Sequence, residues 1–337
     1  MLAFRPAQTC RRLRPLRLIL LSLIIAVTVL SGASPSLAAE PLGIPDWLLP
    51  HVGTEEGQIA PVVLQRARAL HHRKVGEGAV HNACYFAMDA TRPSTSRDGE
   101  PGRRFYVICE ADQTFRAVSS GYGNGRKLAQ ANFSNGRECA QNFSNAEGSN
   151  LTMGGAYVTA EPRTSFKGYT TISGKRTPFL RTFLQFEGEG ETANAREREI
   201  GGHPAVFLKW QCRFRNPGSP HADEEGYVPY GSLVNYTGGR SNGCTSWSPA
   251  ASELILALAQ DNPTTVYIYP ESRDIAAVAN AVKARRSPAD AGAYWNATCL
   301  RAIGAPRFWP EATLRPIIDE WRASLTPAPP GKLPICR

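Results

Sequence analysis

The stretch GYTTISGKRTPFLRTFLQFEG, residues 168–188, contains two runs of β-branched and aromatic residues that are bounded by glycines. Such runs between turn-forming residues are typical of β-strands. The same pattern recurs between residues 82 and 270, in YFAMDA (85–90), RFYVICE (104–110), TFRAVSSG (114–121), GAYVTAE (155–161), AVFLKWQCRF (205–214) and TTVYIYP (264–270). Eight short strands in one region predict a mainly β, α+β fold that is built on a β-sandwich or barrel.

Helical patterns flank this β-rich region. Residues 40–81 contain apolar residues at the spacing of a helix that packs on a core. Ser248 and Pro249 suit the N-cap and the first position of a further helix, and two more helices are expected at 273–286 and 311–325. We therefore expect a helical lead-in at 40–81, the main β-rich domain at 82–270 and a helical C-terminal extension at 271–337.

The first 39 residues have the composition of a secretory signal peptide. Five arginines precede the apolar run Leu18–Leu30, and small residues follow at 36–39. Loss of these arginines lowers the formal charge from +9 to +4. We expect a protein of the periplasm or cell envelope that keeps no transmembrane anchor after cleavage of the signal. Its mild positive charge fits a polyanionic cell wall, and no nucleic-acid motif is present.

The cysteine count points to one free thiol. Cys10 lies in the signal segment, so seven cysteines remain, and an odd number in an oxidising compartment leaves one unpaired. Two strand-like runs separated by a turn suggest the pair Cys84–Cys109. The other pairs that we expect are Cys139–Cys212 and Cys299–Cys336, the second pinning the C-terminal tail. Six cysteines allow other pairings, so the connectivity stays open at this point.

Cys244 is the candidate for the free thiol, in the run GGRSNGCTSW at 238–247. Gly243 directly before it permits a sharp turn, on which main-chain N–H groups of Gly243 and Cys244 can act as an oxyanion hole. Arg240, Ser241 and Asn242 precede the cysteine and are the candidate substrate-binding residues. An arginine at such a position can bind a substrate carboxylate with its two-pronged guanidinium.

Several segments together carry a family resemblance: YFAMDATRPS (85–94), FSNAEGSNLTMGGAYVTAEP (143–162), FKGYTTISG (166–174), NARERE (194–199), HADEEGYVP (221–229) and GRSNGC (239–244). This order resembles the divergent branch of the murein L,D-transpeptidase catalytic family. The resemblance implies a YkuD-like β-rich catalytic fold over residues 82–270, with Cys244 as nucleophile. Better-known members have histidine where this chain has Asn242, and Thr245-Ser246-Trp247 also departs from the usual residues.

A cysteine nucleophile needs a base, and two histidines compete for that role. His221, in HADEEGYVP, resembles the family's histidine segment and is the preferred candidate. His203, in REIGGHPAV, is the alternative, because it fits an ungapped count from NARERE but then requires a long insertion before Cys244.

The resemblance implies acyl transfer on peptidoglycan stem peptides through a Cys244 thioester, as an L,D-transpeptidase or an L,D-carboxypeptidase. No cofactor and no metal site are expected, because the histidines and cysteines show no zinc-type spacing. The alternative, from another functional class, is a non-catalytic wall-binding or envelope scaffold that retains the fold. The chemical state of Cys244 discriminates between them: an enzyme requires a free, reactive thiol.

Overall fold

Residues 43–325 and 331–337 are described by a computed structural model, and the predicted signal peptide lies outside these residues. The chain is a mixed α/β protein with a large, mostly β sheet, with about 34% strand and 25% helix. The lead-in, the β-rich region and the C-terminal extension belong to one compact unit.

The strands follow one another in the order β1 (Cys84–Asp89), β2 (Arg103–Cys109), β3 (Thr114–Ser119), β4 (Tyr122–Gly123), β5 (Asn142–Phe143), β6 (Gly155–Ile172), β7 (Lys175–Gly188), β8 (Gly201–Pro204), β9 (Val206–Arg215), β10 (Tyr227–Asn235), β11 (Arg240–Ser241), β12 (Thr245–Trp247), β13 (Thr265–Tyr269) and β14 (Arg307–Phe308). The α-helices are α1 (Pro61–Gly76), α2 (Pro249–Ala259), α3 (Ser272–Lys283), α4 (Ala297–Ile303) and α5 (Glu311–Ser324). Short 3₁₀ helices are η1 (Asp46–His51), η2 (Gly190–Thr192) and η3 (Ala289–Ala291).

Ten strands form one sheet, whose main path is β12-β8-β7-β6-β13-β1-β2-β3, with β10 joined to β6 and β9 to β10. The two ends of the path meet, because Gly121, just after β3, donates its N–H to the carbonyl of Ser246 on β12 at 2.9 Å. The sheet is thus curled on itself. The prediction of many strands is confirmed in this coarser form, as a single large curled sheet.

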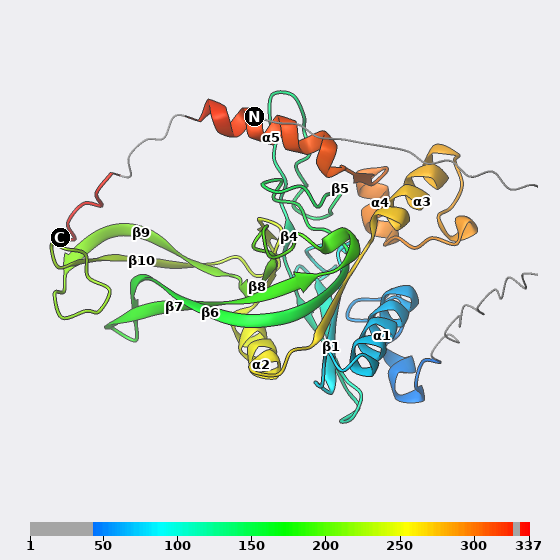
Figure 1. Ribbon diagram of the computed structural model, residues 1–337, viewed down its shortest axis with the longest axis horizontal. Helices are drawn as coiled ribbons and strands as arrows, with labels where there is room; N and C mark the ends of the chain where they lie inside the picture. Colours follow the sequence, from blue (N-terminus) through cyan, green and yellow to red (C-terminus); the bar gives the residue numbers. More distant parts are fainter. Residues whose placement is uncertain (1–42, 326–330) are drawn as a thin grey trace, which may run out of the picture. The chain divides into compact units, whose positions relative to one another are not determined.

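The two faces of the sheet bury different side chains. On one face, Tyr85 and Ala87 of β1 pack with the apolar residues of α1, whose Val63, Leu64 and Ala67 are almost fully buried. On the other, alternate residues of β1 pack with Ile255 of α2. This alternation follows from the period of two along a strand. Figure 1 shows α1 beside β1. Helix α2 contacts β8 and β12.

Two long hairpins extend from the sheet (Figure 1). In the first, β6 and β7 are joined by Ser173 and Gly174, which both have positive φ, as a two-residue type I′ turn requires. The second consists of β9 and β10, and β10 pairs with β6 through Tyr230 and Tyr169. This second hairpin lies between β8 and β12 in the sequence, so it separates two strands that are neighbours in the sheet.

Trp247 anchors the end of the sheet that carries the candidate thiol. Its side chain is fully buried, and its ring lies edge-on to Phe105 with centroids 5.2 Å apart. A Cβ on Gly202, in the neighbouring strand β8, would lie only 1.9 Å from the indole ring. Gly202 therefore has to be glycine for β8 and β12 to pair with the indole inside the curl.

The described residues form three disulfides, and Cys244 is the free cysteine among them. The predicted pair Cys84–Cys109 is confirmed: the two residues face each other across β1 and β2. The other two predicted pairs are wrong. The structure joins Cys139 to Cys299 and Cys212 to Cys336, so the two bonds cross in the sequence.

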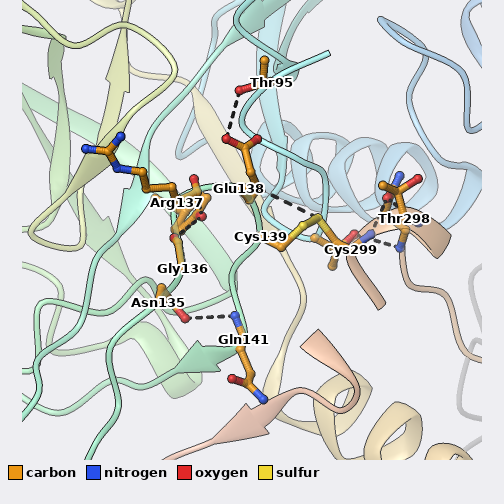
Figure 2. Close-up of a disulfide and its surroundings, with 12 residues drawn as sticks. Thr95, Asn135, Gly136, Arg137, Glu138, Cys139, Gln141, Thr298 and Cys299 are labelled. Carbon is orange, nitrogen blue, oxygen red and sulfur yellow. Dashed lines mark hydrogen bonds between the residues drawn. A yellow bond between two sulfur atoms is a disulfide. The ribbon is translucent and has the colours of Figure 1, made fainter. Parts of the chain in front are cut away.

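Each corrected bond has a structural reason. Cys299 lies on α4, which packs beside the loop that carries Cys139, as Figure 2 shows. The C-terminal tail runs along β9, where Arg213 pairs with Ile335, and this places Cys336 next to Cys212. The expectation of a disulfide-pinned tail is therefore correct, although the partner cysteine differs.

The helix after the thiol begins as predicted. Ser248 is its N-cap, with Oγ accepting the N–H of Ala251 at 3.2 Å, and Pro249 is its first residue. The expected helices at 273–286 and 311–325 correspond to α3 and α5, and Pro316 lies inside α5.

The length of each disulfide loop predicts its contribution to stability. Cys139 and Cys299 are 160 residues apart, whereas Cys84 and Cys109 are 25 apart. In the chain-entropy model the longer loop contributes about 5 kcal/mol and the shorter about 3.5 kcal/mol. We expect the double variant Cys139→Ala/Cys299→Ala to lose more free energy of unfolding in urea than Cys84→Ala/Cys109→Ala. An equal or larger loss in the second variant would contradict this ranking.

The burial of His71 predicts that acid destabilises the fold. It lies on α1 with Nδ1 at 3.2 Å from the Thr265 hydroxyl, and burial lowers its pKa from 6.5 to about 4. The unfolded chain therefore binds the proton more tightly, so this contribution is complete above about pH 6.5 and is lost as the pH falls through 4. His71→Phe should flatten the fall in unfolding free energy over this range. The control is His72→Phe, which changes the adjacent, exposed histidine. An equal flattening in that variant would contradict the assignment of this pH dependence to His71.

Candidate active site

Cys244 lies on the turn that joins β11 to β12. Gly243 has a φ of 115°, and an added Cβ would approach the carbonyl oxygen of Leu151 to 3.0 Å and Ile200 Cδ1 to 3.1 Å. Glycine is therefore needed before the thiol both for the backbone angle and for space. The Gly243 N–H donates to Ser241 Oγ at 3.2 Å. That bond stabilises the turn, so the Gly243 N–H is already occupied in this structure.

His203 lies on β8, the parallel neighbour of β12. It is paired with Ser246, two residues after Cys244. Cys244 itself directly precedes β12, in the bend that leads into this strand. Both His203 and Cys244 line one open cleft of about 920 Å³.

The cleft is rich in uncompensated positive charge. Seven arginine and lysine side chains line it, against three glutamates. Within the described residues Arg322 forms ion pairs, the shorter with Glu147 at 2.9 Å. The remaining cations have no carboxylate within ion-pair distance in that part of the chain: Arg126, Arg163, Lys167, Arg181, Arg198 and Arg240. Such a lining attracts ligands that carry several carboxylates.

The thiol of Cys244 is protonated in the resting cleft. Sγ donates to the carbonyl oxygen of Glu199 at 3.4 Å. Burial raises the pKa of Cys244 above its ordinary value of 9.0, whereas the Gly201 N–H and the cations Arg198 and Arg181 favour the thiolate. Burial has the larger effect, so the resting group is the neutral thiol.

The His203 ring is neutral and its tautomer is defined. Burial, together with the nearby Arg181 cation, lowers its pKa from 6.5 to about 4. Nδ1 lies 3.1 Å from the carbonyl oxygen of Pro204, which can only accept a hydrogen bond. Nδ1 therefore carries the proton, and Nε2 keeps the lone pair that a general base needs.

A small network connects His203 to the cationic lining. The hydroxyl of Tyr236 lies 3.4 Å from His203 Nδ1 and 3.4 Å from Arg181 Nη2. Among the described residues no hydrogen bond joins the His203 ring to the Cys244 thiol. Such catalytic contacts often shorten only when substrate binds. The site therefore contains a neutral thiol and a neutral imidazole in one cleft.

The three other motif residues also line the cleft. Arg240 donates to the carbonyl of Asn135 at 2.8 Å, and Asn242 accepts from Asn150 Nδ2 at 3.3 Å. Ser241 is buried, and its hydroxyl hydrogen-bonds the Cys244 carbonyl within the same turn. Ser241 thus holds the turn together, while Arg240 and Asn242 are the members that face the cleft with exposed surface.

His221, the preferred base in the sequence interpretation, lies elsewhere. It is in the loop between β9 and β10 and stacks on Phe166 with ring centroids 4.0 Å apart. It does not belong to the residues that line the cleft with Cys244, whereas His203 does. The β9–β10 hairpin is inserted between β8 and β12 in the sequence. It accounts for the long distance from His203 to Cys244, which had made His203 the less favoured candidate. The geometry therefore favours His203.

Sequence reasoning missed most of the cationic lining. Arg163, Ser165 and Lys167 alternate along β6 and face the cleft together with Arg181 of β7. Their spacing of two residues in a strand-like run was the signal that was available. Arg198 and Tyr236 gave no comparable signal, because the curl of the sheet brings them to the thiol.

Comparison with family models, with curated proteins and with solved structures found no match. Within residues 43–325 and 331–337, no group of three or more His, Cys, Asp or Glu side chains is placed to hold a metal ion. The same part of the chain contains no helix with the length and apolar character needed to span a membrane.

The raised pKa of Cys244 predicts how the rate of its alkylation by iodoacetamide depends on pH. Since burial raises its pKa, Cys244 should react more slowly than an exposed cysteine at pH 7, and its rate should still rise at pH values above 9. Arg181→Gln removes a cation that favours the thiolate, so it should move the midpoint of the rate profile upward, by up to about one pH unit. Lys283→Gln, remote on α3, is the control. A midpoint below that of an exposed cysteine would contradict the neutral resting thiol.

Proposed function

We propose that this protein is an exported cysteine acyltransferase that acts on peptidoglycan stem peptides, of the L,D-transpeptidase or L,D-carboxypeptidase type. Cys244 is the nucleophile and His203 the general base. The observation that carries the proposal is the free thiol of Cys244 in a cleft that also contains a neutral histidine with Nδ1 engaged and Nε2 unprotonated.

The disulfides support the exported location. Three bonds among six cysteines are the usual state of proteins in oxidising compartments, and the seventh described cysteine is excluded from them. A thiol that remains free beside three disulfides is expected where it has a chemical role. This is the state that the odd cysteine count predicts.

The charge of the cleft supports the substrate class. A stem peptide carries carboxylates along its length and at its terminal D-amino acid. Arg163, Lys167 and Arg181 lie on one hairpin, line the same cleft as Cys244 and form no ion pair among the described residues, so they complement such a ligand. Arginine and lysine at the rim of a cleft also raise the rate of encounter with an anionic polymer.

The reaction that fits this arrangement has two halves. The Cys244 proton passes to His203 Nε2, and sulfur attacks the carbonyl of a diaminopimelyl residue. The bond to the terminal D-amino acid breaks, its amine takes the proton from the imidazolium, and a thioester remains. An amine then attacks the thioester to form a cross-link, or water attacks it to release a trimmed peptide, and the thiol is restored in both cases.

The YkuD-like fold is part of the same proposal. What supports it is the pairing of β8, which carries His203, with β12, which directly follows Cys244, so that both residues line one cleft of a curled β-sheet. The residues near the thiol differ from the better-known family members, with Asn242 in place of histidine. In this chain Asn242 is hydrogen-bonded to Asn150 and has no ring to offer.

One observation favours the alternative of a non-catalytic wall-binding scaffold. Burial raises the thiol pKa and lowers the pKa of His203 to about 4, so proton transfer from the thiol to the imidazole is unfavourable. An enzyme overcomes this with interactions that form only when substrate is bound. A scaffold would leave the thiol inert in every state.

Acylation of Cys244 tests the proposal. A carbapenem should form a covalent adduct that intact-mass spectrometry detects, and Cys244→Ala should abolish it. His203→Ala should slow adduct formation by about 10²-fold to 10⁴-fold, the usual cost of losing a general base. His221→Ala is the matched control and should leave the rate near that of the parent protein.

These outcomes distinguish His203 from His221 as the base and the enzyme from the scaffold, provided that circular dichroism shows each variant folded. A strong effect of His221→Ala with none from His203→Ala would transfer the role of base to His221. No adduct on the parent protein, or an equal adduct on Cys244→Ala, would remove Cys244 as nucleophile and favour the scaffold.

A further inference from the structure

The two long hairpins form a part of the sheet that lies outside the hydrophobic core. We call it the arm: residues 163–183 of β6 and β7 and residues 206–235 of β9 and β10, which pair through Tyr169 and Tyr230. Figure 1 shows the two hairpins extending from the rest of the sheet. Among the described residues, none of the three apolar core clusters includes a side chain of the arm. The arm is therefore held by contacts between its own strands, such as Tyr169 packed edge-on to Phe214 with ring centroids 5.4 Å apart.

Exposed apolar side chains are concentrated on the arm. The described residues contain nine large apolar side chains that are exposed, and five of them belong to the arm: Ile172, Leu180, Phe207, Trp210 and Leu233. A sixth, Ile335, lies on the tail that pairs with β9. Clustered exposed side chains of this kind mark a surface that contacts a partner.

Trp210 is the most informative of these side chains. It is 58% exposed, whereas the other tryptophans of the chain are buried or half-buried. Its Nε1 donates to the carbonyl oxygen of Lys167 at 2.7 Å, so the single polar atom of the indole already has its partner. What remains for an outside contact is the apolar ring.

The exposed apolar residues lie on both faces of the arm. Across β6 and β7, Leu180 pairs with Phe166 and Lys175 pairs with Ile172. Leu180 and Lys175 are five residues apart on β7, so their side chains point to opposite faces, and Ile172 shares the face of Lys175. A partner that docked on one face would leave the other exposed. An apolar environment that surrounds the arm covers both.

The arm is also strongly cationic. Outside the loop 216–226 it contains eight lysine and arginine residues and no aspartate or glutamate. Its three carboxylates all lie in that loop, where Arg213 pairs with Glu225 at 2.8 Å. Four of the cations are exposed, do not line the cleft of Cys244 and form no ion pair within the described residues: Lys175, Arg176, Lys209 and Arg215.

We propose that the arm binds an anionic lipid surface. The four exposed cations contact lipid phosphates, and the indole of Trp210 with Ile172 enters the layer between the headgroups and the acyl chains. Basic residues combined with tryptophan and aliphatic side chains are the usual composition of elements that lie in this interface. Both sets of exposed residues are then used.

The charge of the arm disfavours two other occupants. A second copy of the chain would bring one cationic arm against another, and the strands offer no carboxylate to pair with it. A hydrophilic polyanion would compensate the cations but would leave Trp210, Leu180 and Ile172 in water. An anionic lipid surface complements both the charge and the apolar rings.

This binding is separate from the acyl transfer proposed above. Lys175, Lys209, Trp210 and Ile172 do not line the cleft that contains Cys244. A failure of the arm to bind lipid therefore leaves the proposed chemistry intact, and an unreactive thiol leaves the lipid binding intact.

The experiment is sedimentation with sucrose-loaded vesicles, using the chain without the predicted signal peptide so that its apolar run cannot insert. Vesicles of equal parts phosphatidylglycerol and phosphatidylcholine should bind the protein about tenfold or more tightly than phosphatidylcholine alone. Lys175→Gln/Lys209→Gln should weaken binding to the anionic vesicles by about tenfold. Lys127→Gln/Lys283→Gln removes two exposed lysines outside the arm and is the matched control, which should bind as the parent protein does.

The apolar contact has its own variants. Trp210→Ser/Ile172→Ser should weaken binding by about tenfold or more, because the ring and the aliphatic side chain no longer leave water. Leu49→Ser/Val75→Ser removes two apolar side chains that are exposed outside the arm and is the matched control. Circular dichroism checks that each variant is folded.

A conservative variant keeps the test independent of folding. Phosphatidylglycerol with brominated acyl chains should quench part of the tryptophan emission of the bound parent protein. Trp210→Phe should still bind and should lose this quenched part, because the remaining tryptophans are buried or half-buried in the body.

Three results would overturn the proposal. The first is equal binding to the two kinds of vesicle, or no binding to either. The second is a loss in the control variants as large as in the arm variants. The third is binding to anionic vesicles that Trp210→Ser/Ile172→Ser leaves unchanged and that occurs without quenching of Trp210, which would identify the arm as a site for any polyanion.

Discussion

The contact between the Trp247 indole and the backbone of Gly202 is the constraint on which the site depends. The ring occupies the place of a side chain on β8, and only glycine leaves room for it. Burial of the indole inside the curled sheet adds to the stability that three paired residues give the short strand β12. Because β12 is held in this register, the thiol before it and His203 beside it face the same cleft.

The sequence predicts features formed by residues close together in the chain better than contacts between residues that are far apart in it. The strands at 85–90 and 104–110, their disulfide Cys84–Cys109 and the N-cap Ser248 all follow from residues close together in the chain. The crossed bonds Cys139–Cys299 and Cys212–Cys336 depend on how α4 and the tail pack on distant loops, for which no local pattern exists. Elimination among cysteines therefore produced the wrong partners.

The choice between the two histidines shows the same limit. The sequence favours His221, because HADEEGYVP resembles the family's histidine segment and because His203 requires a long insertion before Cys244. The structure shows that the β9–β10 hairpin accounts for that distance and leaves the sheet between β8 and β12 intact. The inserted hairpin lengthens the segment between β8 and β12 in the sequence, but the two strands remain paired in the sheet. The presence of one free thiol was predictable because a count of cysteines does not depend on spacing, and the run GGRSNGCTSW indicated Cys244.

The crossed disulfides also bear on how the chain matures. In the exported protein that we propose, the chain enters an oxidising compartment from its N-terminus, so Cys139 and Cys212 are both present before Cys299 and Cys336 arrive. Oxidation in order of emergence would join Cys139 to Cys212, a bond that the native structure does not contain. The native set is then reached only by thiol–disulfide exchange. With an oxidant alone, this protein would keep the non-native bond between Cys139 and Cys212, and a disulfide isomerase would allow it to reach the native pairing.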